Sequence, residues 1–354
     1  MSIRLAVVGF RHAHILGLYQ RAEEMEDIEI AAACEEDQTV REEVASQGIV
    51  EITHAGFVEM LADVDCDAVA VGDYYAKRGS LVIASLGQGK HVISDKPLCT
   101  SLDELDQIEE LSSEKGLRVG CMLDMRDAAA FIGVRNLIRK GIIGEIHAIS
   151  FGGQHPLLLG KRPAWYFEPG KHGGTINDIG VHAIDIIPWI TGLRFTVINA
   201  SRCWNALARN FPHFRGAGQM MLTMENGCGV LGDVSYFAPD SSGYSLPFYW
   251  RMTFWGRQGV IETSSGAREI AVALNAESGL RSEPVPHGNP GGYLKSFVRD
   301  IKGEADEDEL CTAQVLRAAR TTLMIQKAAD MDLREVALSS TLARSTSAKL
   351  CRDA

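Results

Sequence analysis

Short apolar segments alternate with amphipathic segments of helix length over the first third of the chain. Short β-branched runs separated by longer amphipathic stretches are typical of β-α-β units, which form a parallel sheet covered on both faces. A capping-box pattern at Ser101 and Glu104 begins one of the helices, and Gly116 ends it. The strands expected in this region span residues 3–8, 28–34, 68–72, 91–94 and 118–122. The pattern predicts a doubly wound α/β domain over residues 1–123.

The periodicity changes after this region. Strand-like alternation dominates, and Glu225-Asn226-Gly227 is a hairpin signal between two apolar runs. The elements expected are a helix over 127–140, a strand over 145–152, a helix over 178–191, strands between 195 and 273, a charged, solvated loop over 300–309 and a helix over 312–329. We therefore expect an α+β domain with an open, mostly antiparallel or mixed sheet over residues 124–339, followed by a polar tail over residues 340–354.

Composition narrows the class of protein. The chain of 354 residues has a formal charge of −11, so a surface for nucleic acid or anionic membrane is not expected. No apolar run reaches the roughly 18 residues that span a bilayer, and Met1 leads directly into a strand-like run rather than a signal peptide. The eight cysteines include no C-x-x-C pair. We expect a reduced, cytoplasmic protein.

A partial dinucleotide-binding loop follows the first expected strand. In Gly9-Phe10-Arg11-His12-Ala13-His14, only Gly9 matches the G-x-G-x-x-G pattern. Its position at a strand-to-helix turn is nevertheless the one that such a loop occupies. The alternative is that Arg11 and His12 belong to an exposed turn with no ligand. His12 and His14 could hold a metal, but the sequence brings no third ligand near them, so no metal is expected.

An acidic run follows the second expected strand. Glu35, the first residue of Glu35-Glu36-Asp37, stands where a carboxylate accepts hydrogen bonds from the adenosine ribose. A carboxylate there repels a 2′-phosphate, which favours NAD over NADP, while Arg11 and Arg41 keep NADP open. The alternative is that these acids cap the next helix.

The residues able to carry acid–base chemistry lie at two places. Lys96, in Asp95-Lys96-Pro97, ends the fourth expected strand, at the edge where open α/β sheets bind ligands. Asp178, His182 and Asp185 would share one face of a helix that begins near residue 175, giving an acid, a base and an orienting carboxylate. The alternatives are a solvated lysine paired with Asp95, an aspartate favouring a helix N-terminus and a buried structural histidine.

Taken together, these motifs resemble the glucose-fructose oxidoreductase and inositol dehydrogenase family, Gfo/Idh/MocA, over nearly the whole chain. The segments that carry the resemblance are Gly9, Ala33-Cys34-Glu35, the run from Gly87 to Pro97, Gly141-Ile142-Ile143-Gly144-Glu145-Ile146 and the run from Gly173 to Asp185. The resemblance implies a Rossmann-type N-terminal domain that binds NAD, with NADP as the alternative. It also implies a homodimer or homotetramer.

The resemblance assigns roles to individual residues. Lys96 would lie beside the nicotinamide and the reacting carbinol, His182 would be the acid/base, and Asp178 would bind the substrate or orient the histidine. The implied cofactor-binding residues are Gly9, Phe10, Arg11, His12, Glu35, Asp73, Tyr74, Asp95 and Lys96. The implied substrate-binding residues are Arg126, Trp165, Tyr166, His172 and Asp178.

The chain departs from the family at the cofactor end. Arg11 and His14 replace loop glycines, and Asp73 and Tyr74 stand where the family has Thr-Pro. The expected activity is reversible oxidation of a secondary alcohol of a sugar, cyclitol or related polyol. One alternative is a glycosidase or lyase that oxidises its substrate transiently with bound NAD, and another is a non-catalytic binding protein with a degenerate cofactor loop.

Overall fold

The first domain is built on a five-stranded parallel sheet. The structure is a computed structural model that describes residues 2–306 and 308–338. The strand order is β2-β1-β3-β4-β5, with β1 Ile3–Val8, β2 Ile28–Cys34, β3 Ala68–Val71, β4 His91–Ser94 and β5 Val119–Cys121. Its helices are α1 His14–Glu23, α2 Gln38–Gln47, α3 Phe57–Asp63, α4 Tyr75–Gly87 and α5 Leu102–Lys115. The strand order reverses between β1 and β3, which makes their carboxyl ends the expected ligand edge.

The caps of α5 confirm the local prediction. Ser101 Oγ accepts a hydrogen bond from Glu104 N at 3.1 Å, and Gly116 ends the helix in the left-handed region with φ +66°. The side chain of Glu104 accepts from Thr100 N in return. The hydrogen-bonding groups left over at both helix ends are therefore satisfied by the residues that the sequence singles out.

The second domain contains a nine-stranded mixed sheet of order β13-β12-β11-β10-β6-β9-β8-β7-β14. Of its pairings, only β6 with β9 is parallel. The strands are β6 Ile146–Pro156, β7 Phe195–Trp204, β8 Ala217–Met224, β9 Gly229–Ala238, β10 Arg251–Gly256, β11 Gly259–Thr263, β12 Glu269–Leu274, β13 Arg281–Pro284 and β14 Arg334–Ala337. The open, mostly antiparallel sheet predicted from the alternation is confirmed.

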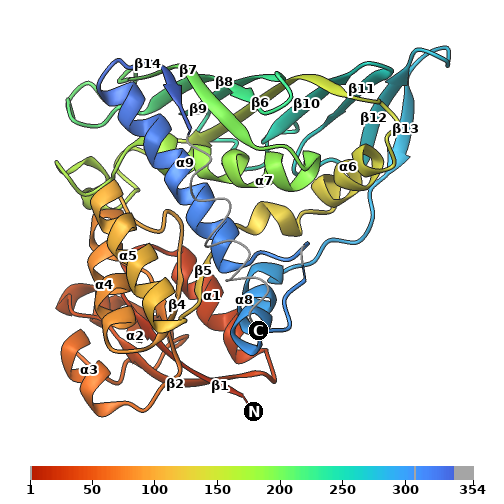
Figure 1. Cartoon of the computed structure of the whole chain (residues 1–354). Helices are drawn as coiled ribbons and strands as arrows, with labels where there is room; N and C mark the ends of the chain where they lie inside the picture. The colour runs from red at the N-terminus through yellow and green to blue at the C-terminus, as the bar shows by residue number, and fades with distance from the viewer. Residues whose placement is uncertain (1, 307, 339–354) are drawn as a thin grey trace.

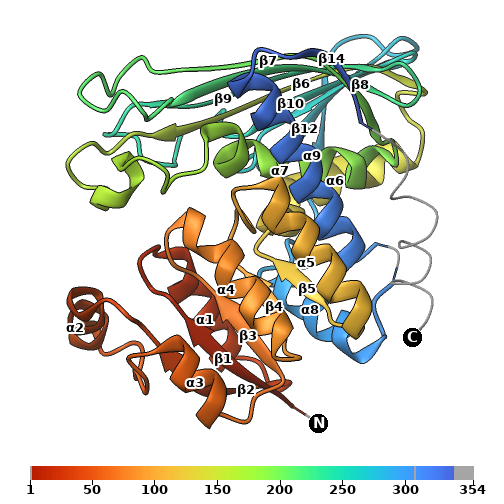
Figure 2. The same ribbon diagram turned by 60° about the vertical axis from the view of Figure 1, so that its left-hand side comes forward.

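Helices lie between the two sheets. Figure 1 shows α6 (Ala129–Arg139) and α7 (Val181–Thr191) under the large sheet, on the side that faces the first domain, while no helix of the described residues covers the opposite side. Helix α9 (Thr312–Asp330) runs from the large sheet down to β5 and α5 (Figure 2). None of the described helices has the length and apolar character needed to cross a bilayer.

The chain returns to the first domain after the second sheet. Helix α8 (Gly292–Lys302) packs on β4 and β5, and its Phe297, like Leu316 of α9, belongs to the core of the first domain. A single boundary at residue 123 does not describe this return. The solvated loop predicted over 300–309 is wrong at its start, because Asp300 is buried and accepts hydrogen bonds from the N–H and hydroxyl of Thr312. The predicted tail, 340–354, lies outside the described residues.

Candidate functional site

A buried arginine positions the turn that follows β4. Arg78, on α4, is fully buried and donates to the carbonyl oxygens of Asp73, Lys96 and Pro97. Its Nη2 also donates to Asp95 Oδ2 at 2.7 Å. A planar guanidinium with five fixed donors can hold several acceptors in one geometry. Arg78 therefore fixes the turn from which Lys96 reaches Asp178 of the second domain.

Lys96 is paired with Asp178. Its Nζ lies 2.7 Å from Asp178 Oδ1, and both residues are almost completely buried. The other oxygen, Oδ2, accepts a hydrogen bond from the hydroxyl of Tyr236. Burial alone would raise the pKa of Asp178, but the positive charge of Lys96 holds that pKa well below its usual range. Asp178 is therefore an anion that binds Lys96 on one side and a phenol on the other.

His172 extends this chain of hydrogen bonds. Its Nδ1 accepts from Gly174 N at 3.3 Å, which leaves the proton on Nε2 for the hydroxyl of Tyr236, 2.9 Å away. Burial lowers the pKa of His172 to about 4, so the imidazole is neutral at neutral pH. The chain of donors runs from His172 through Tyr236 to Asp178.

His182 lies close to this group but makes a different set of contacts. Its Nδ1 is buried and has no hydrogen-bond partner among the described residues. The carboxylate of Asp124 is 3.8 Å from that nitrogen, beyond hydrogen-bond reach, and the ring packs edge-on against Trp250. Burial, with the charge of Lys96 nearby, holds the pKa of His182 well below its ordinary value. The side chain is a neutral imidazole with a free lone pair or N–H at Nδ1.

The helix that carries Asp178 and His182 differs from the predicted one. Residues Ile176–Gly180 form a π-helical turn, and the α-helix begins only at Val181. The wider turn changes the angle between side chains four residues apart, so Asp178 points to Lys96 without bonding His182. Asp185, predicted to orient the histidine, binds Arg126 instead.

Arg126 is engaged within the protein. Its guanidinium binds both carboxylate oxygens of Asp185, at 2.8 and 2.6 Å, and Oε1 of Gln314 at 2.6 Å. The side chain is buried and lies over the ring of Trp189. This bidentate pair between η1 (Asp124–Asp127) and α7 uses the donors that a substrate would need. The structure does not support the predicted substrate contact of Arg126.

The loop after β1 retains the backbone features of a phosphate-binding turn. Gly9 has φ +81°, and a Cβ there would lie 2.7 Å from the Cβ of Asp73. The N–H groups of Arg11, His12 and Ala13 have no hydrogen-bond acceptor among the described residues, and they precede the ten-residue helix α1. Free N–H groups at a helix N-terminus suit a diphosphate. The residues present therefore fit the pyrophosphate of a dinucleotide.

Glu35 follows β2 directly, as predicted, but its carboxylate is bound within the protein. Its carboxylate is completely buried and accepts from Phe10 N at 2.6 Å and from Asp37 N at 2.8 Å. The N–H of Phe10 in the loop needs an acceptor. The hydrogen bond that Glu35 accepts from it holds the Glu35 side chain beneath the loop. The expected hydrogen bond from Glu35 to the ribose is not supported. Phe10 itself packs its ring in the core, against Tyr19.

Arg11 lies above this carboxylate and bridges to the loop after β3. Its Nε lies 3.7 Å from Oε1 of Glu35, and its Nη1 lies 3.5 Å from Oδ1 of Asp73. The guanidinium lies over the ring of Tyr74. Asp73 is buried with φ +75° and accepts from Tyr74 N. Three of the departures from the family, Arg11, Asp73 and Tyr74, therefore form one connected group that the sequence does not reveal.

The loop of residues 157–172 lies against the phosphate-binding turn. Trp165 donates its indole N–H to the carbonyl oxygen of Arg11, and the hydroxyl of Tyr166 is 3.0 Å from Nε2 of His12. Tyr75 completes this contact with its hydroxyl 2.8 Å from that of Tyr166. Trp165 and Tyr166, predicted to face the substrate, thus connect the second domain to the cofactor loop.

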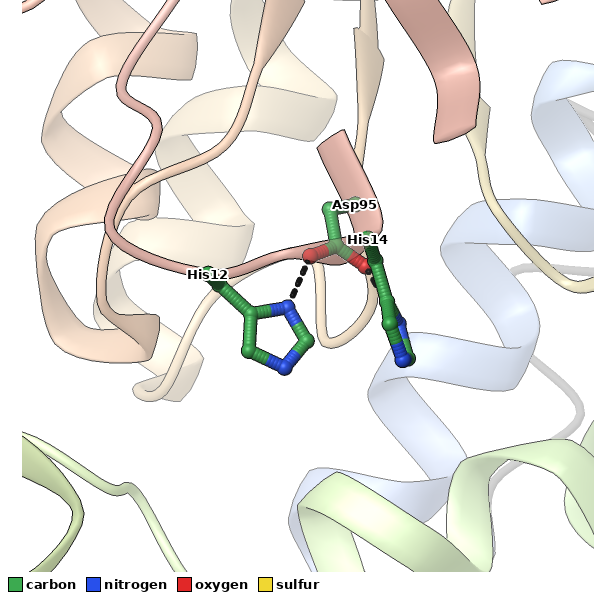
Figure 3. A group of neighbouring side chains, drawn as sticks. All are labelled: His12, His14 and Asp95. Atoms are coloured by element: carbon green, nitrogen blue, oxygen red, sulfur yellow. Dashed lines mark hydrogen bonds and ion pairs between the residues drawn. The ribbon is translucent and has the colours of Figure 1, made fainter. Parts of the chain in front are cut away.

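His12 and His14 meet a third polar side chain that the sequence did not bring near them. His12 Nδ1 lies 2.5 Å from Asp95 Oδ2, and His14 Nδ1 lies 3.4 Å from Asp95 Oδ1. Figure 3 shows the carboxylate of Asp95 between the two imidazole rings. The reason for expecting no metal, the lack of a third ligand, is therefore wrong.

Sequence reasoning missed three residues of the site. Tyr236 and His155 lie on inward positions of β9 and β6, where alternation alone predicts only burial. Arg78 is a charged residue on the buried face of α4, which could have marked it, since such a residue is rarely buried without partners. His155 contacts Tyr249 at 3.0 Å, and burial lowers its pKa to about 3.

A small pocket lies beside these residues. Tyr166 and His172 contribute to its wall, but Lys96, Asp178 and His182 do not. The other lining residues include Phe214, Gln326 and Asp330. The pocket therefore adjoins the group around Asp178 without containing it.

Two family models match successive parts of the chain. Residues 3–122 match a family described as "Oxidoreductase family, NAD-binding Rossmann fold", and residues 131–262 match the "GFO/IDH/MocA C-terminal domain". Together the two matches cover most of the chain.

Individual relatives are distant. The chain is 32% identical over 139 residues to 1,5-anhydro-D-fructose reductase of Ensifer adhaerens, covering 37% of this chain and 40% of that enzyme. It is 24% identical over 341 residues to the inositol 2-dehydrogenase/D-chiro-inositol 3-dehydrogenase of Shouchella clausii, covering 87% and 92%. Several other relatives match over less than half of their length.

A solved structure shares the fold. The inositol dehydrogenase homolog from Azotobacter vinelandii, complexed with NAD⁺, superposes with a TM-score of 0.78 at 16% identity, over 96% of this chain and 97% of that one.

Proposed function

Because the chain belongs to the Gfo/Idh/MocA family of NAD-binding oxidoreductases, we propose that it reversibly oxidises a secondary alcohol of a sugar, cyclitol or related polyol with NAD. The observation that carries this proposal is the buried Lys96–Asp178 pair beside the unpartnered Nδ1 of His182. A cation and a neutral imidazole at the carboxyl edge of the first sheet are the groups that alcohol oxidation needs.

In the proposed reaction, His182 removes the proton from the substrate hydroxyl. Its lowered pKa keeps it neutral, and within residues 2–306 and 308–338 its Nδ1 has no hydrogen-bond partner. Lys96, a donor held in place by Asp178, binds the same oxygen and stabilises the negative charge that develops on it. When bound, NAD accepts the hydride from the carbinol carbon.

Asp178, Tyr236 and His172 keep Lys96 in place. The hydroxyl of Tyr236 and Nζ of Lys96 bind different oxygens of Asp178, so the carboxylate cannot rotate without losing one of them. The His172 ring, fixed by Gly174 N, sets the direction in which Tyr236 donates. Tyr236 and His172 are therefore positioning residues rather than acids or bases.

The charges on the residues after β1 and β2, where the adenosine ribose is expected to bind, favour NAD over NADP. Arg41, which could bind a 2′-phosphate, donates to the carbonyl oxygens of Glu35 and Glu36. Arg11 lies among the carboxylates of Glu35, Asp37 and Asp73. Neither cation is free of acidic neighbours, so a further phosphate would meet net negative charge.

The experiment is an assay of NAD reduction with a panel of secondary alcohols that includes myo-inositol and D-glucose. Growth of the reduced-nicotinamide absorbance with one of them supports the proposal. Cleavage of a glycoside without net NADH would favour the lyase or glycosidase instead. Calorimetry that detects binding of neither NAD nor NADP would contradict both and favour a binding protein.

A further inference from the structure

The loop after β1 and the end of β4 place two imidazoles and a carboxylate around one point. His14 begins α1 and His12 lies two residues before it, while Asp95 follows β4, next to Lys96. One ligand atom from each of the three lies within 4.8 Å of the others. We propose that His12, His14 and Asp95 bind a divalent transition-metal ion of the zinc type. The inference does not rest on the proposed oxidoreductase activity.

An unsatisfied oxygen points to a ligand at this place. Asp95 is completely buried, and its Oδ1 has no hydrogen-bond partner among the described residues. Its Oδ2 is already bound by Arg78 and His12. A buried carboxylate oxygen without a donor is costly. It lies 3.4 Å from Nδ1 of His14, about the separation of two ligand atoms that share one tetrahedral ion with bonds of roughly 2.0–2.2 Å.

The donor set is suited to such an ion. Two imidazole nitrogens and one carboxylate oxygen are the ligands of open zinc and related transition-metal sites, whereas magnesium and calcium prefer oxygen. The side chain of His14 is 48% exposed, so the ion can enter from solvent.

The surroundings can orient the ligands. Arg78 holds Oδ2 of Asp95, which leaves Oδ1 for the ion. The hydroxyl of Tyr166 lies 3.0 Å from Nε2 of His12, and a hydroxyl can accept as well as donate. With the proton on Nε2, His12 would donate a hydrogen bond to the hydroxyl of Tyr166. Its Nδ1 would then bind the ion in place of Asp95 Oδ2. Ligand histidines are commonly held in this way through their second nitrogen.

The competing account is a direct contact between His14 and Asp95 with no ion bound. His14→Ala distinguishes the two, because this exposed side chain can be removed without opening the core. His147→Ala is the matched control, since His147 is exposed on β6, in the other domain.

The test uses the full-length protein, stripped of metal and free of cofactor, titrated with Co²⁺ by visible absorbance and with Zn²⁺ by calorimetry. We expect one equivalent to bind, His147→Ala to match wild type, and His14→Ala and Asp95→Asn each to lose at least about tenfold in affinity. Circular dichroism checks that each variant is folded. Absence of binding to wild type, or unchanged affinity in folded His14→Ala, would overturn the proposal.

Discussion

Lys96 and Asp178 are 82 residues apart in the chain, yet Nζ of one lies 2.7 Å from Oδ1 of the other in a buried ion pair that joins the two domains. The pair combines the end of β4 with the π-helical turn before α7. Removing one partner leaves the other charge buried and alone, which is far more costly than losing both.

We expect Asp178→Asn to lower the free energy of unfolding by up to about 3–5 kcal/mol, because Lys96 loses its counter-charge. The double variant with Lys96→Met should be less destabilised than the sum of the two single variants. Urea unfolding of all four proteins measures this coupling. Additive effects would show that the two charges do not stabilise each other.

Buried histidines, among them His155, His172 and His182, predict a loss of stability in acid. Burial lowers the pKa of His155 to about 3 and of His172 to about 4, and holds the pKa of His182 well below its ordinary value. Each stays neutral in the folded protein but takes up a proton in the unfolded chain below about pH 6.5. The stability that these neutral histidines contribute is therefore complete above about pH 6.5 and is lost as pH falls toward about 4.

Asp127 changes the stability in the opposite direction as pH falls. Burial raises its pKa to about 7, so below that pH its extra proton in the folded state offsets the uptake by one histidine. Burial also raises the pKa of Glu35 and Asp73, which therefore act in the same direction as Asp127. The histidine effect is therefore measured as the fall in the urea midpoint of wild type relative to that of a variant as pH is lowered from about 6.5 to about 4.5. His172→Gln, folded and neutral at all pH values, should make that fall shallower. The same dependence of the urea midpoint on pH in wild type and in folded His172→Gln would contradict this contribution of His172.

Gly9 and Gly17 form a matched pair for testing the cofactor loop. A Cβ at Gly9 would meet Asp73 at 2.7 Å with φ +81°, whereas a Cβ at Gly17, within α1, meets no atom within 4 Å. Gly9→Ala should abolish NAD binding measured by calorimetry. Gly17→Ala should preserve binding and add about 0.5–1 kcal/mol of stability. Equal NAD affinity in the two variants would show that the turn at Gly9 does not hold the cofactor.

The uncovered side of the large sheet suggests how copies of the chain associate. Met221 and Leu231 are paired neighbours on β8 and β9, and with Trp255 of β10 they expose about half of each side chain or more. We expect a homodimer or homotetramer through this surface. Leu231→Glu should reduce the mass measured by light scattering, and Leu280→Glu, at another exposed leucine, should not. A wild-type monomer would rule out this association.

Local signals in the sequence predicted the fold well and the site unevenly. The caps at Ser101 and Gly116 depend on neighbours within a few residues, and strand alternation depends only on burial, so both could be predicted without tertiary information. The partners of Asp185 and Glu35 could not, because Arg126 and the N–H of Phe10 compete for those carboxylates only once the chain is folded. The π-helical turn at Ile176–Gly180 likewise has no signal in periodicity.

The most direct test separates cofactor binding from chemistry in Lys96→Met and His182→Ala. With the substrate that wild type oxidises fastest, each should lose about 10²–10⁴ in kcat, while NAD affinity measured by calorimetry stays within a few-fold of wild type. Lys140→Met, an exposed lysine after α6, should leave both unchanged. Wild-type turnover in either folded variant would contradict the assignment of Lys96 and His182 to the reaction.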